Sequence, residues 1–417
     1  MLALTFQVDT GPRLHLGALK FEGLKDVNED FVRDALTIHS GDLYKPSAIE
    51  SARKTLAELG VFSGVSVHAA DHANADHTID LTFDFQERPM HTVAFSAAYA
   101  TDRGASGSAS WSHHNLFGNA EQLNLKAAVT DIGGTAASGI GYNLSAQFLK
   151  PRFVDPDQAF EADLAGVKQN LDAYNQTAET FGVYLRRKFS ARWNGSAGAT
   201  FAHDDVEQEN TKRLYQLLAL PLSVTYDAVS PSDPLADPLS GYRATFSATP
   251  TLALGSSDLL FAILRAAGSA YFDLSGDGRS VLALRAMAAS IQGGSNLDVP
   301  PDQRLYAGGS ATVRGFRYQS VGPRFADKNP VGATSMDAGT IEFRQRITED
   351  WGAALFADAG QASAESTPFN GKLNVGAGAG VRYYTPIGAI RADFAIPLTH
   401  YNNRDSFEIY IGLGQAF

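Results

Sequence analysis

The spacing of hydrophobic residues divides the chain into two parts that meet near residue 90. In the first part, a strand-like run precedes two segments with an apolar residue at every third or fourth position, as on one helix face. Asn28 suits the N-cap of the first helix, and Pro46 and Gly60 suit the start and end of the second. The pattern therefore predicts a small α/β domain in the order strand, helix, helix, strand, strand, with strands at residues 14–21, 61–68 and 78–86.

From residue 91 onward, apolar and polar residues alternate in about sixteen runs of roughly ten residues. The alternation is clearest at residues 123–130, 242–249 and 407–414. A transmembrane barrel with lipid outside and a wet lumen has this pattern, and a soluble antiparallel sheet shares it. We predict an all-β transmembrane barrel of about sixteen antiparallel strands.

The connections between these runs favour the barrel, because outer-membrane barrels join their strands by alternating short turns and longer loops. Short connections are predicted at residues 190–191, 275–278, 348–350 and 385–388. Longer polar connections are predicted between them, at residues 170–176, 207–212, 361–371 and 399–405. One connection, 227–241, is long where a short one is expected.

Composition narrows the class further. No apolar run reaches the roughly 18 residues that a membrane-spanning helix needs, and a chain that crosses lipid without helices has to close into a barrel. The sequence has no cysteine, which excludes a disulfide scaffold, a zinc–thiolate site and a cysteine nucleophile. A net charge of −11 argues against nucleic acid as a partner. Residues 1–10 lack the features of a signal peptide, so we expect either that it was removed or that the chain begins inside a longer precursor.

The most specific motif is Val313-Arg314-Gly315-Phe316, inside the longest connection, residues 292–337. Beyond it follows Phe356-x-Asp358-x-Gly360, and Glu342 lies one predicted strand earlier. With the small α/β unit placed before a barrel, these residues resemble the superfamily of outer-membrane assembly proteins that includes BamA and TamA. The resemblance covers nearly the whole chain. It implies that the α/β unit is a POTRA domain and that the long loop folds back into the lumen, where the Phe356–Gly360 motif and Glu342 receive it.

Within the superfamily, the last two predicted strands are most similar to TamA, with Tyr-x-Pro-x-Gly-x-Ile-Arg-x-Asp at residues 384–393. The resemblance implies a chain truncated to its last POTRA domain, at residues 11–90, followed by a barrel at residues 91–417. Residues 1–10 are expected to be the last strand of a preceding POTRA domain. A TamB-like partner anchored in the inner membrane would bind through the missing domains.

The alternation of the strands around the motif gives Arg314 a physical role. Ile341, Phe343 and Ile347 share one face, so Glu342 is predicted to point into the lumen. By the same alternation, Phe356 and Asp358 also point inward. A guanidinium between two inward carboxylates makes charge-assisted hydrogen bonds with both, and Gly315 allows a sharp turn beside it. We therefore predict a clamp that pins the loop and braces the wall.

The barrel closes where its first strand, about residues 91–102, meets its last, residues 407–417. A weakly paired seam would leave unpaired backbone groups in lipid, and an incoming strand could pair with them, which predicts a lateral gate. The alternative is that the glycines of the last strand only relieve crowding in the lumen. The candidate gate residues are His91, Val93, Phe95, Phe407, Ile409, Ile411, Gly412, Leu413, Gly414 and Phe417.

No catalytic residue, cofactor site or metal site is predicted. The histidines and aspartates between His68 and His77, and Asp227, Asp233 and Asp237, are better explained as polar turns than as metal ligands. The predicted function is that of a non-enzymatic insertase and translocation subunit in the bacterial outer membrane, with its POTRA domain in the periplasm. Its expected partners are the lipid bilayer and unfolded outer-membrane clients, including autotransporters. A two-partner-secretion transporter and a passive porin or barrel enzyme are the alternatives.

Overall fold

The computed structural model describes residues 12–231, 236–256, 258–386, 388–399 and 406–413. The predicted remnant strand at residues 1–10 lies outside these ranges. The chain forms two compact units. The first contains residues 1–92 together with residues 112–123 and 149–151, and the second contains the remainder.

The first unit contains the predicted α/β domain. Its elements are β1 (His15–Glu22), α1 (Glu29–Ala35), α2 (Pro46–Ala57), β2 (Phe62–Ala69) and β3 (Thr78–Glu87). Strand β3 is central, parallel to β1 and antiparallel to β2. Alternate β3 residues, including Leu81 and Phe83, are buried in one core with Ala52 and Leu56 of α2. Among the described residues, no helix is long and apolar enough to cross a bilayer.

Asn28 occupies the N-cap position of α1, as predicted, but its side chain does not cap the helix. Its amide nitrogen donates instead to the carbonyl of Phe117 at 3.3 Å and to Asn119 Oδ1 at 2.9 Å, within the same unit. The side chain therefore ties the helix start to the turn at residues 117–119.

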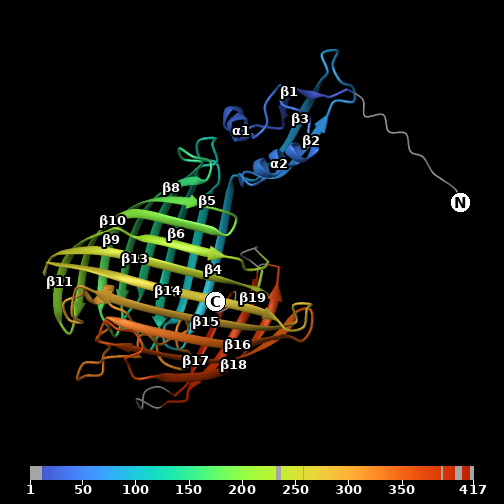
Figure 1. Ribbon diagram of the computed structural model, residues 1–417. Coiled ribbons are helices and arrows are strands. Elements are labelled where there is room, and N and C mark those ends of the chain that lie inside the picture. The colour runs from blue at the N-terminus through green and yellow to red at the C-terminus, as the bar shows by residue number, and fades with distance from the viewer. Residues whose placement is uncertain (1–11, 232–235, 257, 387, 400–405, 414–417) are drawn as a thin grey trace. The chain divides into compact units, whose positions relative to one another are not determined.

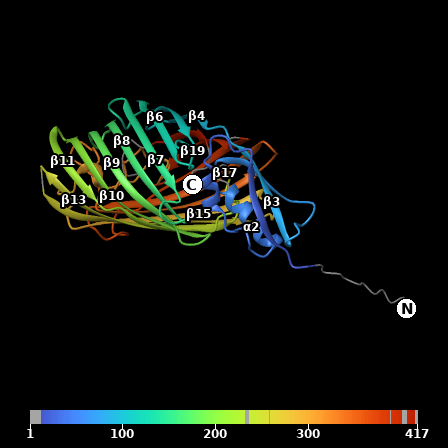
Figure 2. The same cartoon turned by 90° about the horizontal axis from the view of Figure 1, so that it is seen from above.

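The second unit is a closed antiparallel barrel (Figure 1). Its strands are β4 (His91–Ala100), β5 (Gly104–His113), β6 (Gln122–Gly133), β7 (Gly141–Pro151), β8 (Gln158–Asn170), β9 (Asn175–Lys188), β10 (Trp193–Gln208), β11 (Thr211–Ala219), β12 (Leu222–Asp227), β13 (Gly241–Gly255), β14 (Leu259–Asp273), β15 (Ser280–Gln292), β16 (Ser335–Arg346), β17 (Trp351–Ser363), β18 (Asn374–Thr385), β19 (Gly388–Pro397) and β20 (Glu408–Leu413). In Figures 1 and 2, the teal-to-green strands β6–β10 and the gold-to-red strands β15–β19 form opposite walls.

The barrel has sixteen strand positions, as predicted. Strands β11 and β12 both lie between β10 and β13, and they are two segments of one interrupted strand. The interruption falls at Leu220 and Pro221, because a proline has no backbone N–H to donate to the ladder.

The polarity of the wall decides between a membrane barrel and a soluble sheet. Outward residues are apolar and exposed, as at Ile341 (59% exposed) and Leu355 (61%). Their inward neighbours Glu342 and Asp358 are charged and buried. An apolar outside around a polar inside requires lipid as the surrounding solvent, so the soluble alternative is wrong.

One predicted long connection is wrong. Residues 207–212 were expected to form a longer polar loop, but β10 and β11 are joined by the two residues Glu209 and Asn210 alone. Both have positive φ, at 53° and 58°, as in the type I′ turn that connects tightly twisted hairpins. The polar residues counted as loop extend the two strands instead. The connection between Asp227 and Gly241 is long, as the sequence indicated.

Candidate functional site: lumen clamp and barrel seam

The connection between β15 and β16 lies inside the lumen. It spans residues 293–334 and is slightly shorter than the predicted 292–337, because Asp337 already belongs to β16. Its apolar residues Leu305, Val313 and Phe316 are buried in one cluster with inward wall residues such as Tyr215 and Phe261. The loop therefore fills part of the barrel interior.

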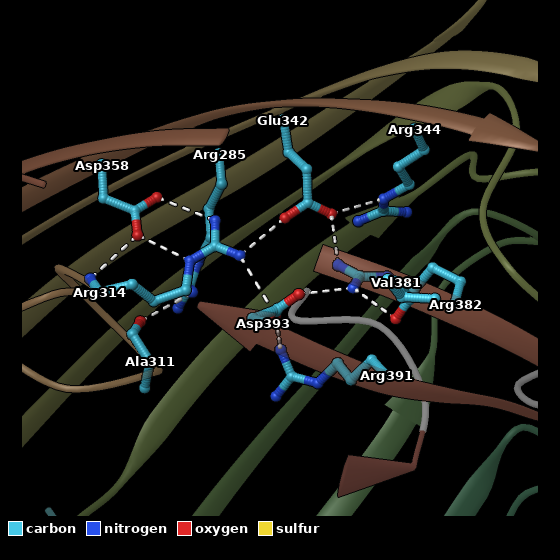
Figure 3. Close-up of polar contacts among 10 residues, drawn as sticks. All are labelled: Arg285, Ala311, Arg314, Glu342, Arg344, Asp358, Val381, Arg382, Arg391 and Asp393. Carbon is cyan, nitrogen blue, oxygen red and sulfur yellow. Dashed lines mark hydrogen bonds and ion pairs between the residues drawn. The ribbon is translucent and has the colours of Figure 1, made fainter. Parts of the chain in front are cut away.

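Arg314 is held by both predicted carboxylates (Figure 3). Its Nε donates to Asp358 Oδ2 at 2.7 Å and its Nη2 donates to Asp358 Oδ1 at 3.0 Å, a bidentate pair. Its Nη1 donates to Glu342 Oε2 at 2.8 Å, and its backbone N–H donates to Asp358 Oδ2 at 2.9 Å. The guanidinium carbon lies 3.4 Å from the ring centroid of Phe356, a cation–π contact. We call Arg314, Glu342, Phe356 and Asp358 the lumen clamp.

The charge network extends beyond these four residues. Asp393 of β19 lies 3.6 Å from Arg314 Nη1 and accepts a 2.5 Å hydrogen bond from Arg382 Nη1 of β18. Arg344 donates to Glu342 at 2.8 Å, and Arg391 lies 3.2 Å from Asp393 (Figure 3). Sequence reasoning did not assign Asp393 or Arg382, although Asp393 closes the motif noted at residues 384–393.

Val313, Gly315 of the loop and Gly360 of β17 allow the loop to pack closely against the wall. A Cβ on Gly360 would lie 2.7 Å from the Val313 side chain, so Gly360 makes room for it. Gly315 has a φ of +92°, and a Cβ there would lie 2.7 Å from the backbone of Ile396. Phe316 is 1% exposed. The structure thus brings together all eight residues that the sequence assigned to the clamp region.

Three alternate glycines of β18, Gly376, Gly378 and Gly380, lie against the clamp, and we call them the β18 floor. Sequence reasoning did not assign them. A Cβ on Gly376 would lie 2.0 Å from the Arg314 carbonyl oxygen, and one on Gly378 would lie 2.4 Å from the Phe356 ring. A Cβ on Gly380 would lie 1.9 Å from the Asp393 carboxylate. The signal was the Gly-Ala-Gly-Ala-Gly run at residues 376–380, whose glycines share the lumen face.

Gly376→Ala is expected to displace the loop, because the new methyl group meets backbone rather than a flexible side chain. We expect faster tryptic cleavage within residues 293–334 and a loss of about 1–3 kcal/mol from overpacking. Gly166→Ala on β8 is the matched control, since a Cβ there meets no atom within 4 Å. Equal cleavage rates in the two variants would contradict a loop seated on the β18 floor.

The loop also contacts the opposite wall. Arg304 Nη1 donates to Gln208 Oε1 of β10 at 2.9 Å, and Arg317 Nη2 lies 3.2 Å from Asp172 Oδ2, in the β8–β9 connection. Nearer the seam, the Arg103 guanidinium of the β4–β5 turn stacks over the Tyr318 ring at 4.4 Å. Beside it, burial raises the pKa of Asp102, in the β4–β5 turn. The loop is therefore a bridge across the lumen with its strongest ion pairs on the β16–β19 side.

The seam between β20 and β4 is shorter than its neighbour within the described residues. Strand β20 pairs with β19 at six positions, from Ala395↔Glu408 to Ile390↔Leu413. It pairs with β4 at two, Tyr410↔Ala100 and Ile411↔Tyr99.

Beyond Ala100, the Thr101 N–H donates to the Ile409 carbonyl at 3.1 Å, and the Thr101 hydroxyl bonds Glu408. No residue of β4 before Tyr99 pairs with a described residue of β20. The contacts that do form lie at the Ala100 end of β4.

The candidate gate residues are distributed unevenly along this seam. Ile409 and Ile411 take part in it, whereas His91, Val93 and Phe95 lie on β4 away from the two residues, Tyr99 and Ala100, that pair with β20. All three are exposed, Phe95 at 78%. Gly412 and Leu413 pair with β19 alone among the described residues, and the Phe407 ring stacks on Phe394. Gly414 and Phe417 lie outside the described residues, as does most of the predicted loop 399–405.

The barrel has sixteen strands and faces lipid, and a buried arginine of an inserted loop is held at its inner wall. A small α/β domain precedes the barrel in the chain. Together these features define an outer-membrane barrel with a periplasmic POTRA domain. The profile of the Omp85 superfamily domain matches residues 115–417, and a POTRA profile, described as surface antigen variable number repeat, matches residues 15–88. The chain belongs to the Omp85 superfamily.

Relatives support the same assignment. The chain is 23% identical to the outer membrane protein assembly factor BamA of Neorickettsia risticii, over 94% of this chain and 54% of that protein. It is 20% identical to BamA of Neisseria meningitidis serogroup B, over 98% of this chain and 57% of that protein. The chain thus spans about half the length of these curated relatives.

Two solved structures share the fold. BamA from Haemophilus ducreyi lacking POTRA domains 1–3 superposes with a TM-score of 0.79 and 18% identity, covering 97% of this chain and 85% of that one. CdiB from Acinetobacter baumannii superposes with a TM-score of 0.65 and 14% identity, covering 96% and 74%. The specific likeness to TamA stays a prediction from the last strands.

Proposed function

We propose that the chain is a non-enzymatic subunit that inserts β-barrel or autotransporter clients into the outer membrane through the seam between β4 and β20. The observation that carries the proposal is the unequal pairing of β20 within the part of the chain that the structure describes, six positions with β19 and two with β4. Backbone groups left unpaired in lipid are costly, so a client strand that pairs with them is stabilised. The curated relatives are named outer membrane protein assembly factors, which supports the same role.

The energy for insertion comes from the client. Each client strand that pairs with the exposed edge of β4 satisfies its own backbone groups as well as those of β4. The lumen clamp holds the inner wall at β16–β19 while β20 and β4 part. In this scheme the protein needs no ATP, cofactor or catalytic side chain.

The POTRA domain is proposed to receive the client before the barrel does. Strand β2 lies at one edge of the three-stranded sheet, where an extended client segment can add as a further strand. Beside this edge, a groove of about 150 Å³ between α2 and β2 is lined by Tyr44, Ile49 and Val67. A TamB-like partner would act through POTRA domains other than this one, as the TamA resemblance implies.

Reconstitution tests the proposal. The full chain in liposomes is expected to accelerate insertion of a urea-unfolded, eight-stranded outer-membrane protein, measured by the protease-resistant folded band. Liposomes that hold an unrelated sixteen-stranded porin are the control. Equal insertion rates in the two preparations would reject the insertase.

Conductance separates the alternatives. A secretion transporter that passes its substrate through the lumen, or a porin, needs a usable pore. Because the loop at residues 293–334 crosses the lumen between Gln208 and Asp358, we expect little conductance in planar bilayers. Large, stable channels together with absent insertion would favour the secretion or porin alternative.

A further inference from the structure

Tyr410 of β20 joins the two parts of the site, and sequence reasoning gave it no role. It pairs with Ala100 in the seam, and among the described residues it is one of two on β20 that pair with β4. Its side chain points into the lumen and is 2% exposed. Tyr410 belongs to a buried apolar cluster with Phe356 of the clamp and Ala395 of β19, and Ala100 of β4 packs against this cluster. A single side chain thus takes part in the cluster that links the clamp, the seam and the neighbouring strand.

The hydroxyl of Tyr410 faces the backbone of the clamp motif. The Gly315 N–H donates to Tyr410 Oη across 3.3 Å, and Tyr410 Oη lies 3.5 Å from the Phe316 carbonyl oxygen, to which it donates. A buried tyrosine hydroxyl needs a polar partner, and here the loop provides both a donor and an acceptor. Withdrawal of the loop would remove the two hydrogen bonds that hold this hydroxyl against the Gly315 and Phe316 backbone.

The approach of the loop depends on glycine at position 315. Gly315 has a φ of +92°, and a Cβ built on it would lie 2.7 Å from the backbone of Ile396, so no side chain fits there. Arg314, one residue earlier, is fixed to Asp358 and Glu342. The ion pairs of the clamp therefore set the position of the N–H that Tyr410 accepts from.

We propose that Tyr410 is a positioning residue that couples the clamped loop to the closed seam. The clamped loop holds the Tyr410 side chain inward, which keeps β20 in register with β4 at Ala100. Release of the loop removes both partners of the hydroxyl, so that β20 and β4 separate more readily. The inference rests on the proposed function only for its biological meaning, because seam opening can be measured without any client.

Hydrogen exchange in lipid nanodiscs tests the coupling. The amide of Thr101 bonds Ile409 across the seam, so its exchange reports the open fraction. Tyr410→Phe keeps the ring and removes the hydroxyl. We expect exchange of the peptide containing Thr101 to rise about fivefold, the effect of one lost neutral hydrogen bond on an equilibrium constant. Tyr383→Phe, on an exposed tyrosine of β18, is the control and should leave exchange unchanged.

A second variant distinguishes coupling from simple loosening. Asp358→Asn weakens the clamp. In a chain that keeps Tyr410, it is expected to raise hydrogen exchange of the Thr101 peptide, whereas in a chain that already carries Tyr410→Phe it should add little. If Asp358→Asn does not fold, Gly376→Ala displaces the loop in its place. The coupling would be overturned if Tyr410→Phe left hydrogen exchange of the Thr101 peptide unchanged, or raised exchange equally in the β15–β16 ladder. It would also be overturned if the effects of Asp358→Asn and Tyr410→Phe on exchange multiplied independently. Absent client insertion with intact coupling would instead refute the proposed function alone.

Discussion

Replacing Arg314 with alanine is expected to release the loop from the β16–β19 wall while the barrel stays closed. The substitution leaves Asp358, 1% exposed, without the arginine that binds it through two nitrogens, and removes one of the two arginines that donate to Glu342, which is 0% exposed. Loss of one member of a buried ion pair typically costs about 3–5 kcal/mol, because the remaining charge stays desolvated. We expect tryptic cleavage within residues 293–334 to become much faster and the unfolding midpoint in guanidinium to fall.

Arg279→Ala is the matched control for this substitution. Arg279 lies in the β14–β15 turn, where its ion pair with Asp277 is more than half exposed and contributes little. Arg314→Lys is also expected to release the loop, since an ammonium lacks the planar fork that binds Asp358 through two nitrogens.

The double variant tests the pairing itself. Asp358→Ala alone is expected to destabilise loop docking, since it leaves the buried guanidinium with fewer carboxylates. Combined with Arg314→Ala, it should add less than its separate cost, because the two residues stabilise the loop through one interaction. If the two losses sum, Arg314 and Asp358 act independently and the clamp is wrong.

Locking the seam with a disulfide is expected to abolish client insertion while leaving the barrel folded. Tyr99 and Ile411 are directly opposed in the ladder, where antiparallel geometry places Cα atoms about 4.5–5.5 Å apart, within the reach of a disulfide. The chain has no native cysteine, so Tyr99→Cys with Ile411→Cys forms a single defined bond. Oxidised protein in liposomes should insert the eight-stranded client no faster than empty liposomes, and reduction should restore the rate.

A disulfide on the other side of β20 is the control. Phe394 and Ile409 are opposed in the ladder between β19 and β20, which pairs at all six described positions of β20. Oxidised Phe394→Cys with Ile409→Cys should insert clients at the unlocked rate, because this ladder does not open in the proposed mechanism. Undiminished insertion by the oxidised Tyr99–Ile411 variant rejects the lateral gate.

Much of the wall was predictable because alternation is a local property. The side-chain period of a strand is two, so the sequence itself indicates which residues face lipid and which face the lumen. Ile341 and Leu355 face lipid, and Glu342 and Phe356 face the lumen. The connection at Glu209 and Asn210 was not predictable in the same way. Polar residues extend strands beyond the membrane as readily as they form loops, and the two-residue turn depends on both residues adopting positive φ.

The sequence by itself determined the sixteen-strand alternation, the α/β domain before it, and the inward direction of Glu342 and Asp358. The tertiary structure decided that Arg382 and Asp393 join the same network, that Gly376 and Gly378 form its floor, and that Tyr410 links the loop to the seam. The physical reason is separation along the chain. Arg314 lies 44 residues from Asp358 and Gly315 lies 95 from Tyr410, so strand register and loop path alone bring them together.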